Sequence, residues 1–174
     1  MPADALTRTM IDAAGLDHPA IFGKLPGHGD FISRGLSGDL RSVIDHWLSD
    51  WLAAARADRA ETFESDYEVA APWLFEGANV TAVLLPSMDA VGRRFPLLVL
   101  TAPDRMTQSV YDAMVEALLE GTSADDLRGA LAALAASAPQ SGRKPRWFLP
   151  DGAEQLLPMP DSVGSWPSVE GCFV

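Results

Sequence analysis

The chain has 174 residues, of which 48% are hydrophobic and 21% are charged, a composition that predicts one globular domain and excludes a disordered or fibrous protein. Its formal net charge of −11 would repel phosphate backbones, so nucleic acid is not expected as a partner. The single cysteine, Cys172, cannot form an internal disulfide, and a cytoplasmic location is therefore expected.

Residues 1–19 are predicted to be a mobile leader. Asp4, Asp12 and Asp17 interrupt any apolar run of the kind that an export signal needs. No stretch of the chain approaches the about 18 consecutive apolar residues of a membrane-spanning helix. We therefore expect no direct insertion into a membrane.

The segment of residues 21–36 has the sequence IFGKLPGHGDFISRGL. Proline restricts φ and glycine accepts positive φ, so the middle of this segment favours a turn between two short strands. Side chains alternate along a strand, so Phe31 is expected on one face of the sheet, with Asp30 and Ile32 on the other. The turn-forming residues are Pro26, Gly27 and Gly29.

A helix is predicted over residues 40–55, where apolar residues recur at steps of three and four. Ser37 or Asp39 is expected to cap its start. Trp47 and Trp51 lie on the apolar face, and we predict that they pack against a sheet rather than bind a ligand. The whole face comprises Leu40, Val43, Ile44, Trp47, Leu48, Trp51, Leu52 and Ala55.

From Tyr67 to Thr101 the pattern changes to that of strands. Aromatic, β-branched and apolar runs predict strands at residues 72–76, 80–85 and 94–101. The loop of residues 86–92 is longer than a tight turn requires. Extra loop length beside a central strand is common at functional sites.

Two further helices are predicted. Residues 110–118 carry an apolar stripe, and Gly121 is expected to end that helix in the left-handed conformation. Ser123, followed by Asp126, is expected to cap the next helix, and Pro139 to end it. The apolar face of the second helix comprises Leu127, Ala130, Leu131 and Leu134.

These elements predict an α/β fold: a single-domain sandwich with a five-stranded, mainly antiparallel sheet flanked by helices. Strands joined by short turns pair antiparallel, whereas a doubly wound parallel sheet would need a crossover helix after each strand. The arrangement resembles the longin and profilin-like sandwiches, with one helix on one face and two on the other. Residues 20–138 are expected to form this domain, and the Pro- and Gly-rich residues 139–174 to wrap onto it.

Two segments resemble those of a known family. GKLPGHGDF followed by Arg-Gly at residues 23–35, and LLPSMDAVGRRFPL at residues 84–97, are similar to the signature segments of the TagF, or ImpM, family of accessory proteins of bacterial type VI secretion. They occur in the family's order, with a tryptophan-bearing helix between them. The resemblance implies a repressor that acts after translation by binding a forkhead-associated (FHA) scaffold protein of the apparatus.

No spacing typical of catalysis or metal binding is found. Gly23-Lys24 lacks the earlier glycine and the following Ser or Thr of a phosphate-binding loop, and the histidines and cysteine lack a zinc spacing. The residues available for a hydrolytic triad are Ser87, His28 and Asp30 or Asp89. The sequence around this serine lacks the glycines of a nucleophile elbow. We therefore predict no metal, no cofactor and no enzymatic activity.

The two signature segments are predicted to lie side by side and to form a partner-binding surface. Its members are Gly27, Gly29, Asp30, Phe31, Arg34, Pro86, Ser87, Asp89, Gly92 and Arg93. Opposite charges at short spacing, Asp30 with Arg34 and Asp89 with Arg93, either form ion pairs that hold the loops or contact a partner.

The alternatives to a repressor are a structural longin-like module of a larger assembly and a small hydrolase. The sequence predicts no oligomeric state.

Overall fold

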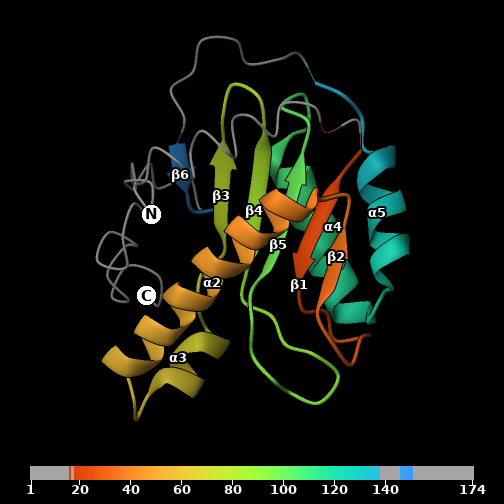
Figure 1. Cartoon of the computed structure of the whole chain (residues 1–174). Coiled ribbons are helices and arrows are strands. Elements are labelled where there is room, and N and C mark those ends of the chain that lie inside the picture. The colour runs from red at the N-terminus through yellow and green to blue at the C-terminus, as the bar shows by residue number, and fades with distance from the viewer. Residues whose placement is uncertain (1–15, 17, 138–145, 151–174) are drawn as a thin grey trace.

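The computed structural model describes residues 16, 18–137 and 146–150. Its centre is a six-stranded sheet in the order β2-β1-β5-β4-β3-β6, in which every pair of neighbours is antiparallel (Figure 1). The strands are β1 (Ala20–Gly23), β2 (Ile32–Arg34), β3 (Trp73–Glu76), β4 (Thr81–Leu85), β5 (Leu97–Thr101) and β6 (Arg146–Phe148). The helices are α2 (Gly38–Asp58), α3 (Phe63–Glu68), α4 (Thr107–Glu120) and α5 (Ala124–Ala133). The predicted α/β class with an antiparallel sheet is confirmed.

Strand β5 lies in the middle of the sheet, between β1 and β4. All of its residues are buried, which agrees with the apolar run in the sequence and with a strand covered on both faces. Val99 lies opposite Ile21 of β1 and Val83 of β4. The strongly apolar centre of the sheet therefore joins the two segments that contain the signature motifs.

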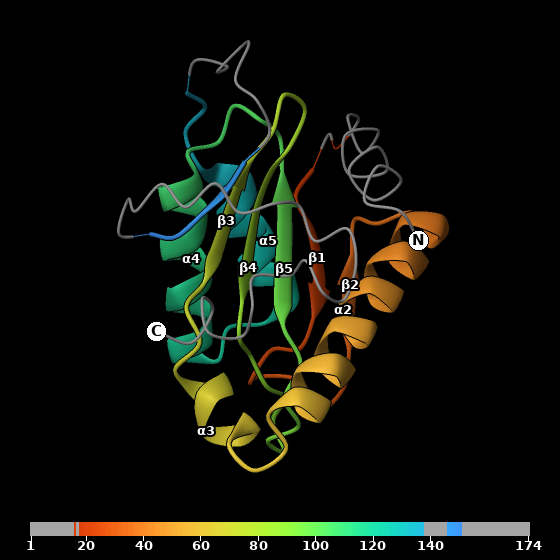
Figure 2. The ribbon, with the colours of Figure 1, turned by 90° about the vertical axis from the view of Figure 1, so that its left-hand side faces the viewer.

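Helices cover both faces of the sheet (Figure 2). Alternate strand residues point to opposite sides, so Phe22 joins a core cluster with α2 and α3, whereas Ile21 joins a cluster with α4 and α5. One helix was predicted on one face and two on the other. The structure has two on each face, α2 with α3 and α4 with α5, because α3 was not predicted. Among the described residues, no helix is both long enough and apolar enough to span a membrane.

Helix α2 begins after Ser37, whose hydroxyl accepts a hydrogen bond from the Leu40 amide at 3.3 Å. Trp51 is buried on the face that packs against the sheet, as predicted. Trp47 is half-buried at the edge of the same core and lies 6.4 Å from Trp147 of β6, centroid to centroid. The buried residues of this face are Leu40, Ile44, Leu48, Trp51, Leu52 and Ala55.

The predicted boundaries of α4 and α5 are largely confirmed. Gly121 follows α4 in the left-handed conformation, with φ of 65°. Ser123 caps α5 and accepts a hydrogen bond from the Asp126 amide at 3.1 Å. Helix α5 ends at Ala133, however, so Leu134 is its C-cap rather than part of its face. Pro139, the predicted end of the helix, lies outside the described residues.

The sheet has a sixth strand that was not predicted. β6 belongs to the segment expected to be a wrapped tail, and it pairs with β3 at the edge of the sheet. Trp147 is buried there, 5.0 Å from the ring of Phe75. A run of three residues is too short to show alternation, so only its partner strand reveals it. Most of the predicted leader and most of residues 139–174 lie outside the described part of the chain.

Tyr67, which the sequence pattern assigned to the strand region, lies elsewhere in the structure. It lies in α3 and is buried together with Phe63. The helix has only six residues, and its two apolar side chains, four positions apart, are too few to establish a helical period. This short helix positions a residue of the site described next.

Candidate functional site

Two loops lie side by side at one end of the sheet. Residues 24–31 connect β1 to β2, and residues 86–96 connect β4 to β5. Because Gly23 pairs with Leu97, the first loop leaves the sheet where the second one enters it (Figure 1). The Ala90 amide donates to the carbonyl of His28 at 2.8 Å. The predicted proximity of the two signature segments is therefore present in the structure.

The second loop is a small hairpin with its own hydrogen bonds. Met88 and Arg94 form an antiparallel bridge, and the Phe95 amide donates to the Ser87 carbonyl at 3.0 Å. The Gly92 amide donates to the carbonyl of Asp89 at 2.9 Å, and Gly92 has φ of 82°, which a residue with a side chain rarely adopts. The loop is therefore a defined turn and not an irregular excursion.

Asp89 is the electrostatic centre of the two loops. Its buried carboxylate accepts from Lys24 Nζ at 2.9 Å and from Arg93 Nε at 2.7 Å. Its other oxygen accepts from the amides of Val91 at 3.1 Å and Arg93 at 2.9 Å. Burial opposes ionisation of Asp89, but the hydrogen bonds from Lys24, Arg93 and Val91 together hold its pKa well below the ordinary value.

Arg93 connects the two loops directly. Its guanidinium donates to Asp89 in its own loop and to the carbonyl of Gly29 in the other, the latter at 2.7 Å. The predicted ion pair between Asp89 and Arg93 is thus present. Lys24, which the sequence analysis weighed only as part of a phosphate-binding loop and did not include in the predicted surface, completes the arrangement by donating to the Arg93 carbonyl at 3.3 Å.

Ser87 and Tyr67 anchor the base of the second loop. The Ser87 hydroxyl donates to the carbonyl of Lys24 at 2.8 Å. The backbone amide of Ser87 donates to the Tyr67 hydroxyl at 3.1 Å, and that hydroxyl lies 3.2 Å from the Ser87 carbonyl, to which it donates. Burial raises the pKa of Tyr67, so the phenol stays neutral. Pro86, another predicted site residue, is half-buried next to this contact.

Phe31 gives the site an aromatic surface. Its ring lies 4.7 Å from that of Phe95 in an edge-to-face arrangement, and Lys24 Nζ lies 4.9 Å from the ring centre. The side chain is nevertheless 46% exposed. Phe31 stacks on Phe22, on the α2 face of the sheet, whereas Ile32 packs on the opposite face, as the predicted alternation requires.

The predicted pair between Asp30 and Arg34 does not form. Arg34 Nε donates to Asp125 of α5 at 2.8 Å, and this contact raises the pKa of Arg34 and lowers that of Asp125. Asp30 accepts from the amide of Phe31 at 2.8 Å instead. Arg34 is therefore directed towards α5 and does not join the group formed by Lys24, Asp89 and Arg93.

Two glycines allow close approach of backbone segments. A Cβ atom on Gly27 would lie 2.5 Å from the carbonyl oxygen of Gly121, so the first loop packs against the connection between α4 and α5. A Cβ atom on Gly23, whose φ is 130°, would lie 1.9 Å from the carbonyl oxygen of Pro96. Gly29, by contrast, has open space at this position. Sequence reasoning named Gly27 and missed Gly23.

The residues of the hypothetical triad are bonded to other groups. Ser87 donates to Lys24, and Asp89 is held by Lys24 and Arg93. The Nε2 atom of His28 accepts from the Ala124 amide at 3.0 Å. Within the described residues, no three His, Cys, Asp or Glu side chains are placed to hold a metal ion.

The fold and the interlocked loops define an antiparallel α/β sandwich with a structured loop surface at one end of its sheet. It resembles the crystal structure of PA0076 from Pseudomonas aeruginosa PAO1, with 26% sequence identity and a TM-score of 0.56 over 69% of this chain and 64% of that one. The match thus spans less than two thirds of that protein's chain. A comparison with curated proteins gave no match.

A sequence family identifies the chain more specifically. The family described as TagF N-terminal domain, Type VI secretion system-associated, matches residues 20–143. The chain therefore belongs to the TagF family, as its two signature segments predicted, and it is a type VI secretion-associated protein.

Proposed function

We propose that the protein is a non-enzymatic accessory protein that represses type VI secretion after translation by binding an FHA scaffold component. The family match over residues 20–143 is the observation that carries this proposal. Repression and the scaffold partner are what the resemblance of the two signature segments implies. We infer that the protein acts in the cytoplasm, where the scaffold would be reached.

The loop surface has the properties of a protein-binding site. Hydrogen bonds to Asp89 hold both loops in one arrangement, so little conformational entropy would be lost on binding. Around this support, Phe31 is 46% exposed and Val91 is 71% exposed, while 58% of the Arg93 side chain is accessible. Aromatic and arginine side chains commonly dominate the energy of protein interfaces.

The absence of catalysis is also a proposal, and the bonding of Ser87 and His28 supports it. The Ser87 hydroxyl is buried and donates to a backbone carbonyl, and His28 Nε2 already accepts from a backbone amide. A serine nucleophile needs a neighbouring base that accepts its proton. Turnover of generic ester or phosphate substrates that disappears in Ser87→Ala, or stoichiometric zinc by elemental analysis, would contradict the proposal.

The decisive test is overproduction in cells with an active type VI system. We expect excess folded protein to stop export of the secreted tube protein, because it occupies the scaffold. Deletion of the gene should raise export. A structural module of the apparatus would give the opposite result on deletion. Unchanged export despite abundant folded protein would overturn the repressor.

Val91→Glu locates the binding surface, with Leu119→Glu as the matched control. Both side chains are exposed, Val91 on the second loop and Leu119 on α4, where it is 82% accessible. A carboxylate inserted into an apolar interface should weaken scaffold binding by about 2 kcal/mol or more. Arg93→Glu is a poorer probe, because it also removes the bonds to Asp89 and Gly29. Equal capture of the scaffold by both variants would exclude the loops.

A further inference from the structure

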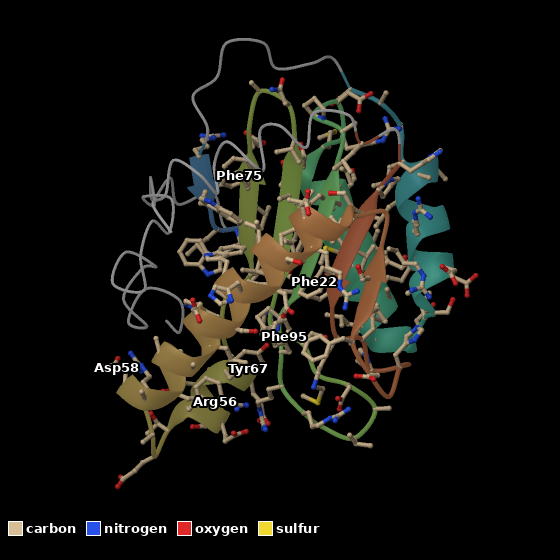
Figure 3. All side chains as sticks on the ribbon, viewed as in Figure 1. Phe22, Arg56, Asp58, Tyr67, Phe75 and Phe95 are labelled. Carbon is tan, nitrogen blue, oxygen red and sulfur yellow. The ribbon has the colours of Figure 1, made fainter. Side chains whose placement is uncertain are left out.

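A groove lies between α2 and the two loops. Its volume is about 560 Å³, within the range of about 300–1,000 Å³ that is usual for ligand sites. One wall is formed by Leu52 and Arg56 of α2, and the other by Phe31, Arg93 and Phe95. Figure 3 shows Arg56 at the same end of the molecule as Phe95. The groove adds a surface of α2 to the two signature segments.

The charge of this groove is opposite to that of the whole chain. The chain carries 24 acidic and 13 basic residues. The groove is nevertheless lined by four basic side chains and one acidic side chain. The basic residues are Lys24, Arg56, Arg93 and Arg94, and the acidic residue is Glu64. A local excess of positive charge in a concave, partly apolar site attracts anionic groups.

Internal ion pairs neutralise part of this charge and leave Arg56. Lys24 and Arg93 share the carboxylate of Asp89, and Arg94 pairs with carboxylates of α3. Arg56 lies 5.0 Å from the ring centre of Phe63, and within the described part of the chain it forms no ion pair. An exposed guanidinium without a carboxylate partner, beside the exposed Arg93, suits a carboxylate supplied by another molecule.

The groove is amphipathic as well as cationic. The ring of Phe31, which is 46% exposed, provides most of the apolar surface beside the guanidinium groups, and the buried side chains of Leu52 and Phe95 line the groove with small areas. A single small anion would leave that apolar surface uncovered. A short peptide with carboxylates on either side of an apolar side chain would satisfy both components.

We propose that this groove binds an acidic segment of a partner protein, with Arg56 and Arg93 contacting carboxylates and Phe31 contacting an apolar side chain between them. The proposal rests on the proposed function only in taking the ligand to be a protein segment. It adds the chemistry of that segment and the contribution of α2, which neither signature motif contains.

Fluorescence anisotropy with a labelled peptide of sequence Glu-Asp-Leu-Glu-Asp tests the groove in the purified full chain. The comparison peptide, Gln-Asn-Leu-Gln-Asn, carries the same label. Arg56→Glu is the test variant. Arg41→Glu is its control, because it changes the net charge equally on an exposed position of the same helix outside the groove. We expect the acidic peptide alone to bind, and Arg56→Glu to weaken it about tenfold, with little change for Arg41→Glu.

The proposal is overturned by absent binding of the acidic peptide, by equal binding of the amide peptide, or by equal losses in the two variants. Displacement of the peptide by an equal concentration of inorganic phosphate would also overturn it, because the site would then take small anions. Scaffold capture separates this inference from the proposed function. Capture without peptide binding removes only the groove, whereas peptide binding without capture removes only the scaffold partner.

Discussion

Replacing Tyr67 by Phe tests whether α3 holds the second loop in place. The Tyr67 hydroxyl lies 3.1 Å from the Ser87 amide and 3.2 Å from the Ser87 carbonyl oxygen. The carbonyl keeps the Phe95 amide as a donor at 3.0 Å, whereas the buried amide loses the acceptor that the hydroxyl provided. A buried donor left unsatisfied costs about 1–3 kcal/mol. We therefore expect the free energy of unfolding to fall by that amount.

Urea unfolding followed by tryptophan fluorescence measures this loss. Tyr111→Phe is the matched control, since the chain has two tyrosines and Tyr111 is half-buried on α4, on the opposite face of the sheet. Its change should stay within about 0.5 kcal/mol, as is usual for substitutions that break no buried network. If Tyr67→Phe unfolds at the same urea concentration as the wild type and the control, the proposed anchoring of the loop is refuted.

Three further predictions concern the core and the loops. Trp51→Ala should lower the free energy of unfolding by about 3–5 kcal/mol, because it empties the buried face of α2; a thermal melt like that of the wild type would contradict this placement. Gly23→Ala should prevent folding, whereas Gly29→Ala should fold normally, as circular dichroism of the two variants will show. The pKa of Asp89 is lowered in the folded protein, so its charge stabilises the fold above the unfolded pKa of about 3.9, and this stabilisation is lost as the pH falls. The free energy of unfolding of Asp89→Asn should therefore fall less on acidification than that of the wild type. Urea unfolding at several pH values measures this, and equal losses in the two proteins would refute it.

Local features were predicted well because their interactions join residues close in sequence. Ser37 and Ser123 cap helices through amides three positions away, and Gly121 ends α4 through its own backbone conformation. The alternation of Phe31 and Ile32 likewise follows from strand geometry alone. In each case the residue and its partner lie within one turn or one strand.

The two pairs of opposite charges, offered by the sequence either as ion pairs or as partner contacts, show where such reasoning fails, because one ion pair is present and the other is absent. Asp89 and Arg93 lie in a tight turn, so four positions bring their side chains together. Asp30 and Arg34 have the same spacing, but β2 begins at Ile32 and ends at Arg34, so the chain is extended between the two side chains. An extended chain advances about 3.3 Å per residue, so extension moves the two side chains apart where a tight turn would bring them together. Asp125 of α5 then becomes the partner of Arg34.

The sequence by itself determined the helix caps and the apolar faces, because each depends on residues within one continuous segment. It also determined the family, because each of the two signature segments can be recognised from its own residues without knowing where they meet. Only the tertiary structure decided which distant groups meet: Lys24 with Asp89, Tyr67 with Ser87, and β6 with β3. The physical reason is that periodicity shows which side of an element is apolar but not which other element will cover it. The groove beside Arg56 likewise depends on the tertiary structure, because α2 and the two loops form it only after the sheet has brought them together.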